Sequence, residues 1–192
     1  MKGKLILILG PSGSGKGTLI NYVKTEFPNF VFPVSCTTRA MRPGEIAGDV
    51  YHFISKAEFQ AKIAADEFLE YAIVHGDNYY GTLKSQILEP LAEGKTVFRE
   101  VDIQGVQSLQ KLIPKDKLKT IFIKTSKIND WEELKRRITS RAEISNEELE
   151  QRYKSYLTEI EFADMADQII YNENLDHAKN DLKNTILQFI AT

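Results

Sequence analysis

The fold of this chain is decided by one stretch, Leu5-Ile6-Leu7-Ile8-Leu9-Gly10-Pro11-Ser12-Gly13-Ser14-Gly15-Lys16-Gly17-Thr18. Its five leading apolar residues are too few for a helix and predict a buried strand. Helical spacing of apolar residues begins only at Leu19 and Ile20, so a glycine-rich loop must join the strand to a helix. Such a loop turns backbone N–H groups toward a helix N-terminus, where hydrogen bonds and the helix dipole hold an anion. The stretch therefore predicts a phosphate-binding loop.

The residue types within this loop agree with that prediction. Gly10, Gly13 and Gly15 let the backbone approach a phosphate closely, and Lys16 supplies a positive charge for the outer phosphates. Residues 10–16 match the first seven positions of the nucleotide-binding pattern G-x-x-x-x-G-K-[ST]. The eighth position holds Gly17, and a hydroxyl follows only at Thr18. The usual hydroxyl ligand of a metal ion is therefore missing from its usual position.

Composition limits the class of protein. The chain has 192 residues, enough for one domain with a full hydrophobic core. Its net charge of −2 argues against a partner such as nucleic acid or a membrane surface, because binders of polyanions carry a basic excess. The single cysteine, Cys36, allows no internal disulfide and favours a reducing compartment. No apolar run approaches the ~20 residues that span a bilayer, and the early first strand leaves no room for a signal peptide. We expect a cytoplasmic protein.

Strands and helices are expected to alternate along the chain. Expected strands cover residues 5–9, 30–35, 51–53, 68–74, 79–82, 96–102, 119–125 and 168–171. Helices are expected from the loop to about 26 and over about 55–66, 83–92, 105–112, 129–140 and 145–165. A closing helix carries Leu175, Ala178, Leu182, Ile186 and Phe189 on one face. This order predicts an α/β fold, a parallel sheet covered by helices on both faces, with residues 36–82 as a small insertion of sheet and helix.

The arginines are grouped in the sequence. The chain has seven arginines and eighteen lysines, and the arginines stand at 39 and 42, at 136, 137, 141 and 152, and alone at 99. An arginine fork matches two phosphate oxygens at once, so the two groups indicate two further phosphate contacts. The alternative is that they are solvated surface charges, paired in the second group with Glu133 or Glu143.

Two carboxylates follow the strand expected at 96–102. Alternation places Glu100 and Asp102 on one face at the end of the strand where ligands sit in open α/β sheets. Carboxylates beside phosphates normally act through Mg²⁺ or its waters. An ion pair with Lys16 or Arg99 is the alternative. Arg99 itself occupies a strand position where an apolar residue is expected, so it needs a partner or solvent.

Taken together, these motifs resemble those of the guanylate kinases, over essentially the whole chain. The matching segments are residues 10–16, 35–45, 48–53, 67–70, 78–82 and 100–105 and the arginines from 137 to 152. The resemblance implies a P-loop NTPase-type fold with a core of residues 1–35, 83–125 and 165–192, an NMP-binding insertion at 36–82 and a helical lid at about 134–152. It implies phosphorylation of GMP, and of dGMP, by ATP with Mg²⁺, in purine nucleotide recycling.

The resemblance also implies roles for individual residues. ATP would be bound by Gly10, Pro11, Ser12, Gly13, Ser14, Gly15, Lys16, Gly17 and Thr18, with Asn172 where adenine packs. The GMP phosphate would be held by Arg39, Arg42, Tyr51 and Tyr80, and guanine read by Ser35, Glu70 and Thr82 with Asp102 nearby. The catalytic cations would be Lys16, Arg39, Arg42, Arg137, Arg141 and Arg152. Glu100 and Asp102 would hold Mg²⁺ through water.

The chemistry of guanine supports the assignment of Glu70. Guanine presents two adjacent donors, N1–H and the exocyclic amine, which one carboxylate accepts together, whereas N1 of adenine is an acceptor. A site built on such hydrogen bonds discriminates against the wrong base by a factor of ~10⁴ to 10⁵ in kcat/KM. Without the neighbouring motifs, the sequence would be equally compatible with Glu70 as an exposed carboxylate on an edge strand.

Three residues depart from the family pattern: Gly17, Arg99, and Ala142 in place of a lid glycine. Two other functions stay open. One is a kinase for another small phosphorylated acceptor, and the other is a non-catalytic guanylate kinase-like module that binds phosphorylated peptides. The intact Gly13, Gly15 and Lys16 argue against the module. The sequence leaves the choice between monomer and homo-oligomer open.

Overall fold

The structure of the protein is a computed structural model, which describes residues 2–49, 51–74, 77–128, 130–140 and 144–192. The strands are β1 (Lys4–Leu9), β2 (Cys36–Thr37), β3 (His52–Phe53), β4 (Phe68–Val74), β5 (Asn78–Leu83), β6 (Thr96–Glu100), β7 (Leu118–Lys124) and β8 (Gln168–Tyr171). The helices are α1 (Lys16–Glu26), α2 (Lys56–Ala64), α3 (Ser85–Ala92), α4 (Ile103–Leu112), α5 (Asp130–Thr139), α6 (Asn146–Glu161) and α7 (Leu175–Ile190). Short 3₁₀ turns cover Lys115–Lys117 and Ala163–Met165. Within the described ranges, no helix is long and apolar enough to cross a membrane.

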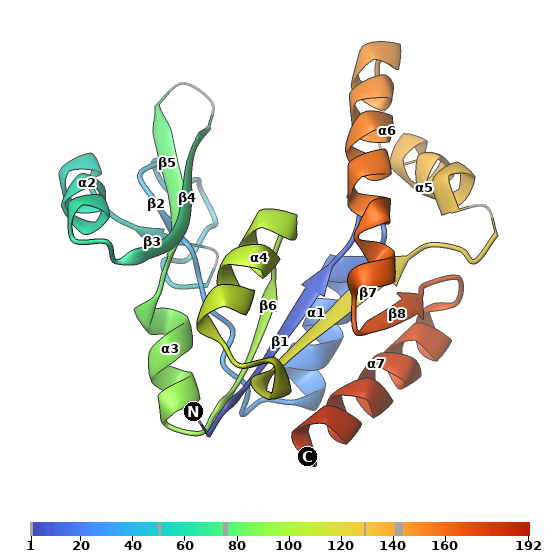
Figure 1. Cartoon of the computed structure of the whole chain (residues 1–192). Coiled ribbons are helices and arrows are strands. Elements are labelled where there is room, and N and C mark those ends of the chain that lie inside the picture. The colour runs from blue at the N-terminus through green and yellow to red at the C-terminus, as the bar shows by residue number, and fades with distance from the viewer. Residues whose placement is uncertain (1, 50, 75–76, 129, 141–143) are drawn as a thin grey trace.

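The core sheet has the strand order β6-β1-β7-β8, and each neighbouring pair is parallel. Every residue of β1 is buried, because the sheet is covered on both faces. On one face, Leu5, Leu7 and Leu9 share a core with residues of α3 and α4. On the other face, Ile6 and Ile8 share a core with residues of α1 and α7. The predicted parallel sheet with helices on both faces is confirmed (Figure 1).

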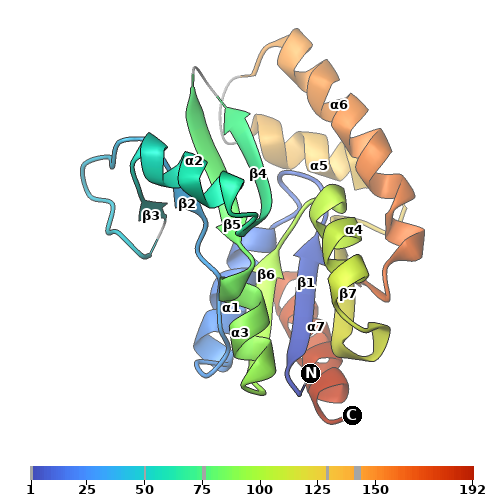
Figure 2. The ribbon, with the colours of Figure 1, turned by 60° about the vertical axis from the view of Figure 1, so that its left-hand side comes forward.

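A second, mixed sheet has the order β3-β2-β5-β4. Strands β2 and β3 are parallel, while β2 and β4 both run antiparallel to β5. Helix α2 covers this sheet through Phe59, whose ring stacks on Phe68 with centroids 4.2 Å apart. Figure 1 shows the second sheet and α2 on one side of the core and the helices α5 and α6 on the other. In Figure 2 the hairpin of β4 and β5 stands beside α4, which it contacts. The division into core, insertion and lid stays a prediction.

The strand predicted at 30–35 is wrong. Only Val31 pairs there, as an isolated parallel bridge to Val97. Its N–H donates to the Thr96 carbonyl and its own carbonyl accepts from Phe98, both at 2.9 Å. Pro33 has no N–H to continue such a ladder, so the chain leaves the sheet edge after one bridge.

Several predicted boundaries also shift, among them those of β6 and α6. Strand β6 ends at Glu100 rather than at 102, because the Asp102 side chain caps α4 by accepting from the Gly105 N–H at 2.7 Å. The helix predicted to reach 165 ends at Glu161, and a 3₁₀ turn follows. The predicted start of a helix at Asn129 lies outside the described residues.

Candidate active site

The loop between β1 and α1, residues 10–18, is called the phosphate loop below. Gly10, Gly13 and Gly15 have φ angles of 139°, 91° and 94°, a region that side chains rarely adopt. A Cβ on Gly10 would lie 2.5 Å from the Ile123 carbonyl oxygen, and one on Gly15 would lie 2.2 Å from Nδ2 of Asn172. The backbone path of the loop therefore requires glycine at these places.

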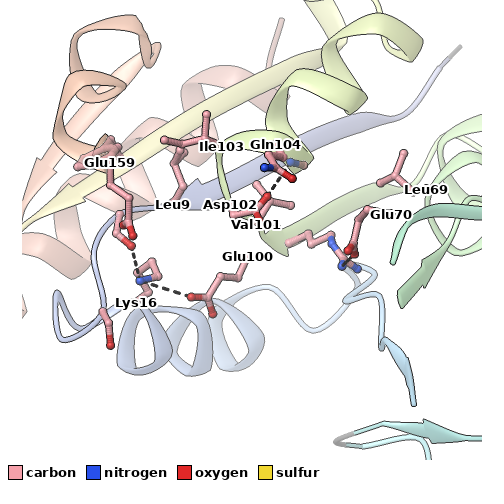
Figure 3. Close-up of a pocket in the computed structure, with 15 residues that line it drawn as sticks. Leu9, Lys16, Leu69, Glu70, Glu100, Val101, Asp102, Ile103, Gln104 and Glu159 are labelled. Atoms are coloured by element: carbon pink, nitrogen blue, oxygen red, sulfur yellow. Dashed lines mark hydrogen bonds and ion pairs between the residues drawn. The ribbon is translucent and has the colours of Figure 1, made fainter. Parts of the chain in front are cut away.

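Lys16 lies folded over the phosphate loop. Its ammonium donates to the carbonyls of Gly10 at 2.6 Å and Pro11 at 3.0 Å. It also lies 3.5 Å from Oε1 of Glu100, the ion pair that is the alternative to metal binding by this carboxylate. The Glu159 carboxylate of α6 points toward the same ammonium (Figure 3). Burial raises the pKa of Glu159, and the charge of Lys16 partly offsets that effect.

A cavity of about 580 Å³ extends from the phosphate loop to the second sheet. Gly10, Ser12 and Lys16 line it at the loop, and Glu70 lines it at the second sheet. Between them it is lined by residues of β6, the start of α4 and α6, among them Arg99, Glu100, Asp102 and Glu159 (Figure 3). Its volume lies in the range of small-molecule sites. The cavity therefore brings the loop and the predicted base-reading carboxylate into one space.

Ser35, Glu70 and Thr82, here called the base cluster, are brought together. Glu70 and Thr82 are paired across the antiparallel strands β4 and β5, which puts their side chains on one face. The Thr82 hydroxyl donates to Oε1 of Glu70 at 2.7 Å. The hydroxyl oxygens of Ser35 and Thr82 lie 3.2 Å apart. Because the single hydrogen of Thr82 goes to the carboxylate, Ser35 is the donor in that second bond.

The four residues predicted at the GMP phosphate lie outside the lining of the cavity described above. The rings of Tyr51 and Tyr80 pack edge to face at 5.5 Å, and the Arg39 guanidinium lies 5.6 Å from the Tyr51 ring. Glu45 accepts from both Nη atoms of Arg39, at 2.8 and 3.0 Å, and this pairing raises the pKa of Arg39. Arg42 is exposed, and its backbone N–H donates to Glu45 at 2.7 Å. The structure groups Arg39 with the tyrosines but does not bring them to the phosphate loop.

Arg137 of α5 reaches the phosphate loop through Asn172. Its Nη2 donates to the Asn172 carbonyl at 2.7 Å, and the Asn172 side chain donates to the Ser14 carbonyl at 2.8 Å. Nε of Arg137 donates to Glu133, and Arg136 with Arg137 lowers the pKa of Glu133 to about 2. Asn172 thus sits between the predicted lid and the loop.

Arg152 of α6 contacts the loop directly. Its Nη1 donates to the Ser12 hydroxyl at 3.3 Å, and its Nη2 pairs with Glu148 at 2.8 Å. Arg141 and Ala142, the other lid positions singled out in the sequence, lie outside the described residues.

The predicted Mg²⁺ ligands stand where β6 ends. Glu100 has a half-exposed carboxylate, whereas Asp102 already uses Oδ1 to cap α4. No group of three or more His, Cys, Asp or Glu able to hold a metal ion occurs among the described residues. Mg²⁺ at kinase sites keeps several waters and needs only one or two carboxylates besides the phosphates. Glu100 and Asp102 fit a water-mediated site of this kind.

Two features of the site were missed by the sequence analysis. Glu159 is one of several glutamates on the polar helix α6, and nothing local marks it as the one that faces Lys16. Arg99 was noted as an anomaly, but its ion pair with Glu70 joins residues 29 positions apart on different sheets. No periodic pattern indicates such a contact.

Comparisons with known proteins agree with this geometry. A family model described as guanylate kinase matches residues 2–189. The guanylate kinase of Carboxydothermus hydrogenoformans is 40% identical over 183 residues, which cover 95% of this chain and 86% of that protein. That of Clostridium tetani is 42% identical over 185 residues, covering 96% and 86%. The crystal structure of guanylate kinase from Anaplasma phagocytophilum matches with a TM-score of 0.68 and 26% identity, covering 97% of this chain and 85% of that one.

Proposed function

The chain belongs to the guanylate kinase family and phosphorylates GMP with ATP, and we propose that the transfer occurs in the cavity between the phosphate loop and the base cluster. One observation carries this proposal. A single cavity of about 580 Å³ has Gly10, Ser12 and Lys16 of the phosphate loop at one end and Glu70 at the other. Two nucleotides entering from opposite ends would meet at their phosphates.

ATP is proposed to bind along the phosphate loop. The N–H groups of residues 10–18 would hold its β and γ phosphates, and Lys16 would exchange its two carbonyl partners for phosphate oxygens. That exchange is favourable because hydrogen bonds between two ionised groups are stronger than those to a neutral carbonyl. Asn172, buried beside Gly15, is proposed to lie at the adenine.

GMP is proposed to bind at the second sheet. Glu70 would accept N1–H and the amine of guanine, with Ser35 and Thr82 completing the contacts and Asp102 nearby. We propose dGMP as a second acceptor, because Glu70 would accept the same two donors from its guanine. Arg39, Arg42, Tyr51 and Tyr80 would hold the GMP phosphate. Because these four lie outside the cavity, we propose that residues 36–82 close toward the core when substrates bind.

Phosphoryl transfer requires alignment and neutralisation of charge rather than covalent catalysis. Lys16, Arg39, Arg42, Arg137, Arg141 and Arg152 are the proposed catalytic cations. Glu100 and Asp102 would hold Mg²⁺ through its waters, and the ion would supply positive charge beside the ATP phosphates. Movement of residues 134–152 over the cavity would bring the lid arginines to the transferring group and exclude water. The acceptor phosphate is already anionic at pH 7, so no general base is needed.

An acceptor panel tests this function. With ATP as donor, the purified protein should phosphorylate GMP and dGMP and leave AMP and UMP unchanged. Activity on another acceptor, with none on either guanine nucleotide, would identify a different small-molecule kinase. Failure to bind ATP in a titration would favour the non-catalytic module. We propose that the GDP product serves purine nucleotide recycling.

A further inference from the structure

Arg99 is a cation buried in the core sheet. It belongs to β6, where it stands in register with Leu7 of the central strand β1. Its side chain is only 10% exposed, and burial lowers its pKa below the ordinary value of arginine. Val97, two residues earlier on the same face of the strand, is fully buried in the apolar core. A charge at such a place opposes folding unless it is compensated.

The compensation comes from the base cluster. Nη2 of Arg99 lies 3.1 Å from Oε1 of Glu70, and it also donates to the Thr82 hydroxyl. Thr82 donates in turn to the same Oε1 at 2.7 Å. Both donors therefore bind the same carboxylate oxygen of Glu70, Oε1. Nε of Arg99 is buried and makes no hydrogen bond within the part of the chain that the structure describes. The arginine is thus poorly satisfied as a structural ion pair.

The geometry matters because guanine needs both carboxylate oxygens of Glu70. N1–H and the amine lie side by side, so the carboxylate must be coplanar with the base to accept from both. A glutamate whose side chain is 43% exposed has several rotamers available to it. Two donors fixed on Oε1 remove that freedom before the base arrives. One of these donors, Arg99, comes from the rigid core rather than from the second sheet.

We propose that Arg99 is a positioning residue that determines guanine specificity, by fixing the Glu70 carboxylate so that it accepts N1–H and the amine together. This inference rests on the proposed function of Glu70 in binding GMP. A purely structural role is disfavoured by the burial and the unpaired Nε. Replacing Arg99 by an apolar residue should not destabilise the fold, because Glu70 is solvated and β6 is a buried strand.

The test compares wild type with Arg99→Met, using GMP and IMP as acceptors. IMP keeps N1–H but lacks the amine, so the ratio of kcat/KM for GMP to that for IMP measures the second hydrogen bond. We expect KM for GMP to rise by about tenfold or more, the size of a lost hydrogen bond to a charged group. The GMP to IMP ratio should fall by about the same factor, with KM for ATP unchanged and Tm equal or higher. Lys183→Met, which removes a cation paired with Glu26 far from the cavity, is the matched control and should behave as wild type.

The outcomes separate this inference from the proposed function. Wild type that does not use GMP would refute the function itself. An active wild type with an Arg99→Met variant of unchanged GMP to IMP ratio would overturn only the role of Arg99. Equal increases of KM for GMP and KM for ATP, together with a lower Tm, would mean that Arg99 has a structural role, and would also overturn the inference. If Arg99→Met fails to fold, Arg99→Lys replaces it, because a single ammonium keeps the charge but not the fork. The GMP to IMP ratio of Arg99→Lys should lie below that of wild type, and an unchanged ratio would again refute the inference.

Discussion

The side chain of Asn172 donates to the backbone carbonyl of Ser14 at 2.8 Å, which joins the end of β8 to the phosphate loop. Asn172 is 5% exposed, and its Nδ2 fills the space that a Cβ on Gly15 would need. The loop is therefore shaped by a buried contact 158 residues away in the sequence. The glycine pattern alone does not specify that contact.

Asn172→Ala should loosen the loop. The Ser14 carbonyl loses its partner, so the free energy of unfolding should fall by about 1–3 kcal/mol, with a higher KM for ATP. Urea unfolding and initial rates measure the two effects. Asn184→Ala, on the exposed face of α7, is the control and should change neither. An Asn172→Ala variant with wild-type stability and KM would show that the contact does not shape the loop.

Arg39→Ala should damage catalysis without unfolding the protein. If Arg39 holds the acceptor phosphate, kcat/KM for GMP should fall by ~10²-fold or more, because a cation at the transferring group is lost. The side chain contacts Glu45 and the rim of the second sheet, so Tm should stay within a few degrees. Lys154→Ala, which removes an exposed cation of α6, serves as the control. Normal steady-state kinetics of Arg39→Ala would exclude it from the GMP site.

Glu133 should make stability depend on pH in the acid range. Hydrogen bonds from Arg136 and Arg137 lower its pKa from 4.5 to about 2 in the folded protein. A carboxyl with a lowered pKa stabilises the fold above its unfolded-state pKa, and this contribution is lost as the pH falls through the folded-state value. The stability advantage of wild type over Glu133→Gln should therefore be full at pH 6 and shrink between about pH 5 and pH 2. Denaturant unfolding at several pH values measures it, and a constant difference would contradict the ion-pair account.

Gly17→Ser should be accepted by the fold. A Cβ at this position meets no atom within 4 Å, and serine in the first turn of α1 has a better helix propensity than glycine. The new hydroxyl stands where related phosphate loops hold the metal, so half-maximal activity should require less Mg²⁺. Gly17→Ala adds the Cβ without the hydroxyl and should leave the Mg²⁺ requirement unchanged. Equal Mg²⁺ requirements in all three proteins would mean that this position does not approach the metal.

The parts of the fold that depend on local pattern were predicted from the sequence. The apolar run of β1 and the glycines of the loop act over a few residues. The helix starts predicted near 55 and 145 are local too, because Ser55 and Ser145 cap α2 and α6 by accepting from an N–H three residues later. The strand predicted at residues 30–35 was wrong, because strand propensity does not show that Pro33 prevents pairing at the sheet edge. The contact of Arg99 with Glu70 and the orientation of Glu159 toward Lys16 depend on how distant elements pack. Such contacts leave no periodic signal in one sequence.

The central claim is that ATP and GMP meet phosphate to phosphate in one cavity. It is tested most directly by inhibition with adenosine and guanosine joined through five phosphates, a molecule that spans both ends. The account predicts one bound molecule per chain and competitive inhibition against both ATP and GMP. Competition with ATP alone, with KM for GMP unaffected, would contradict the claim that both nucleotides share the space between Lys16 and Glu70.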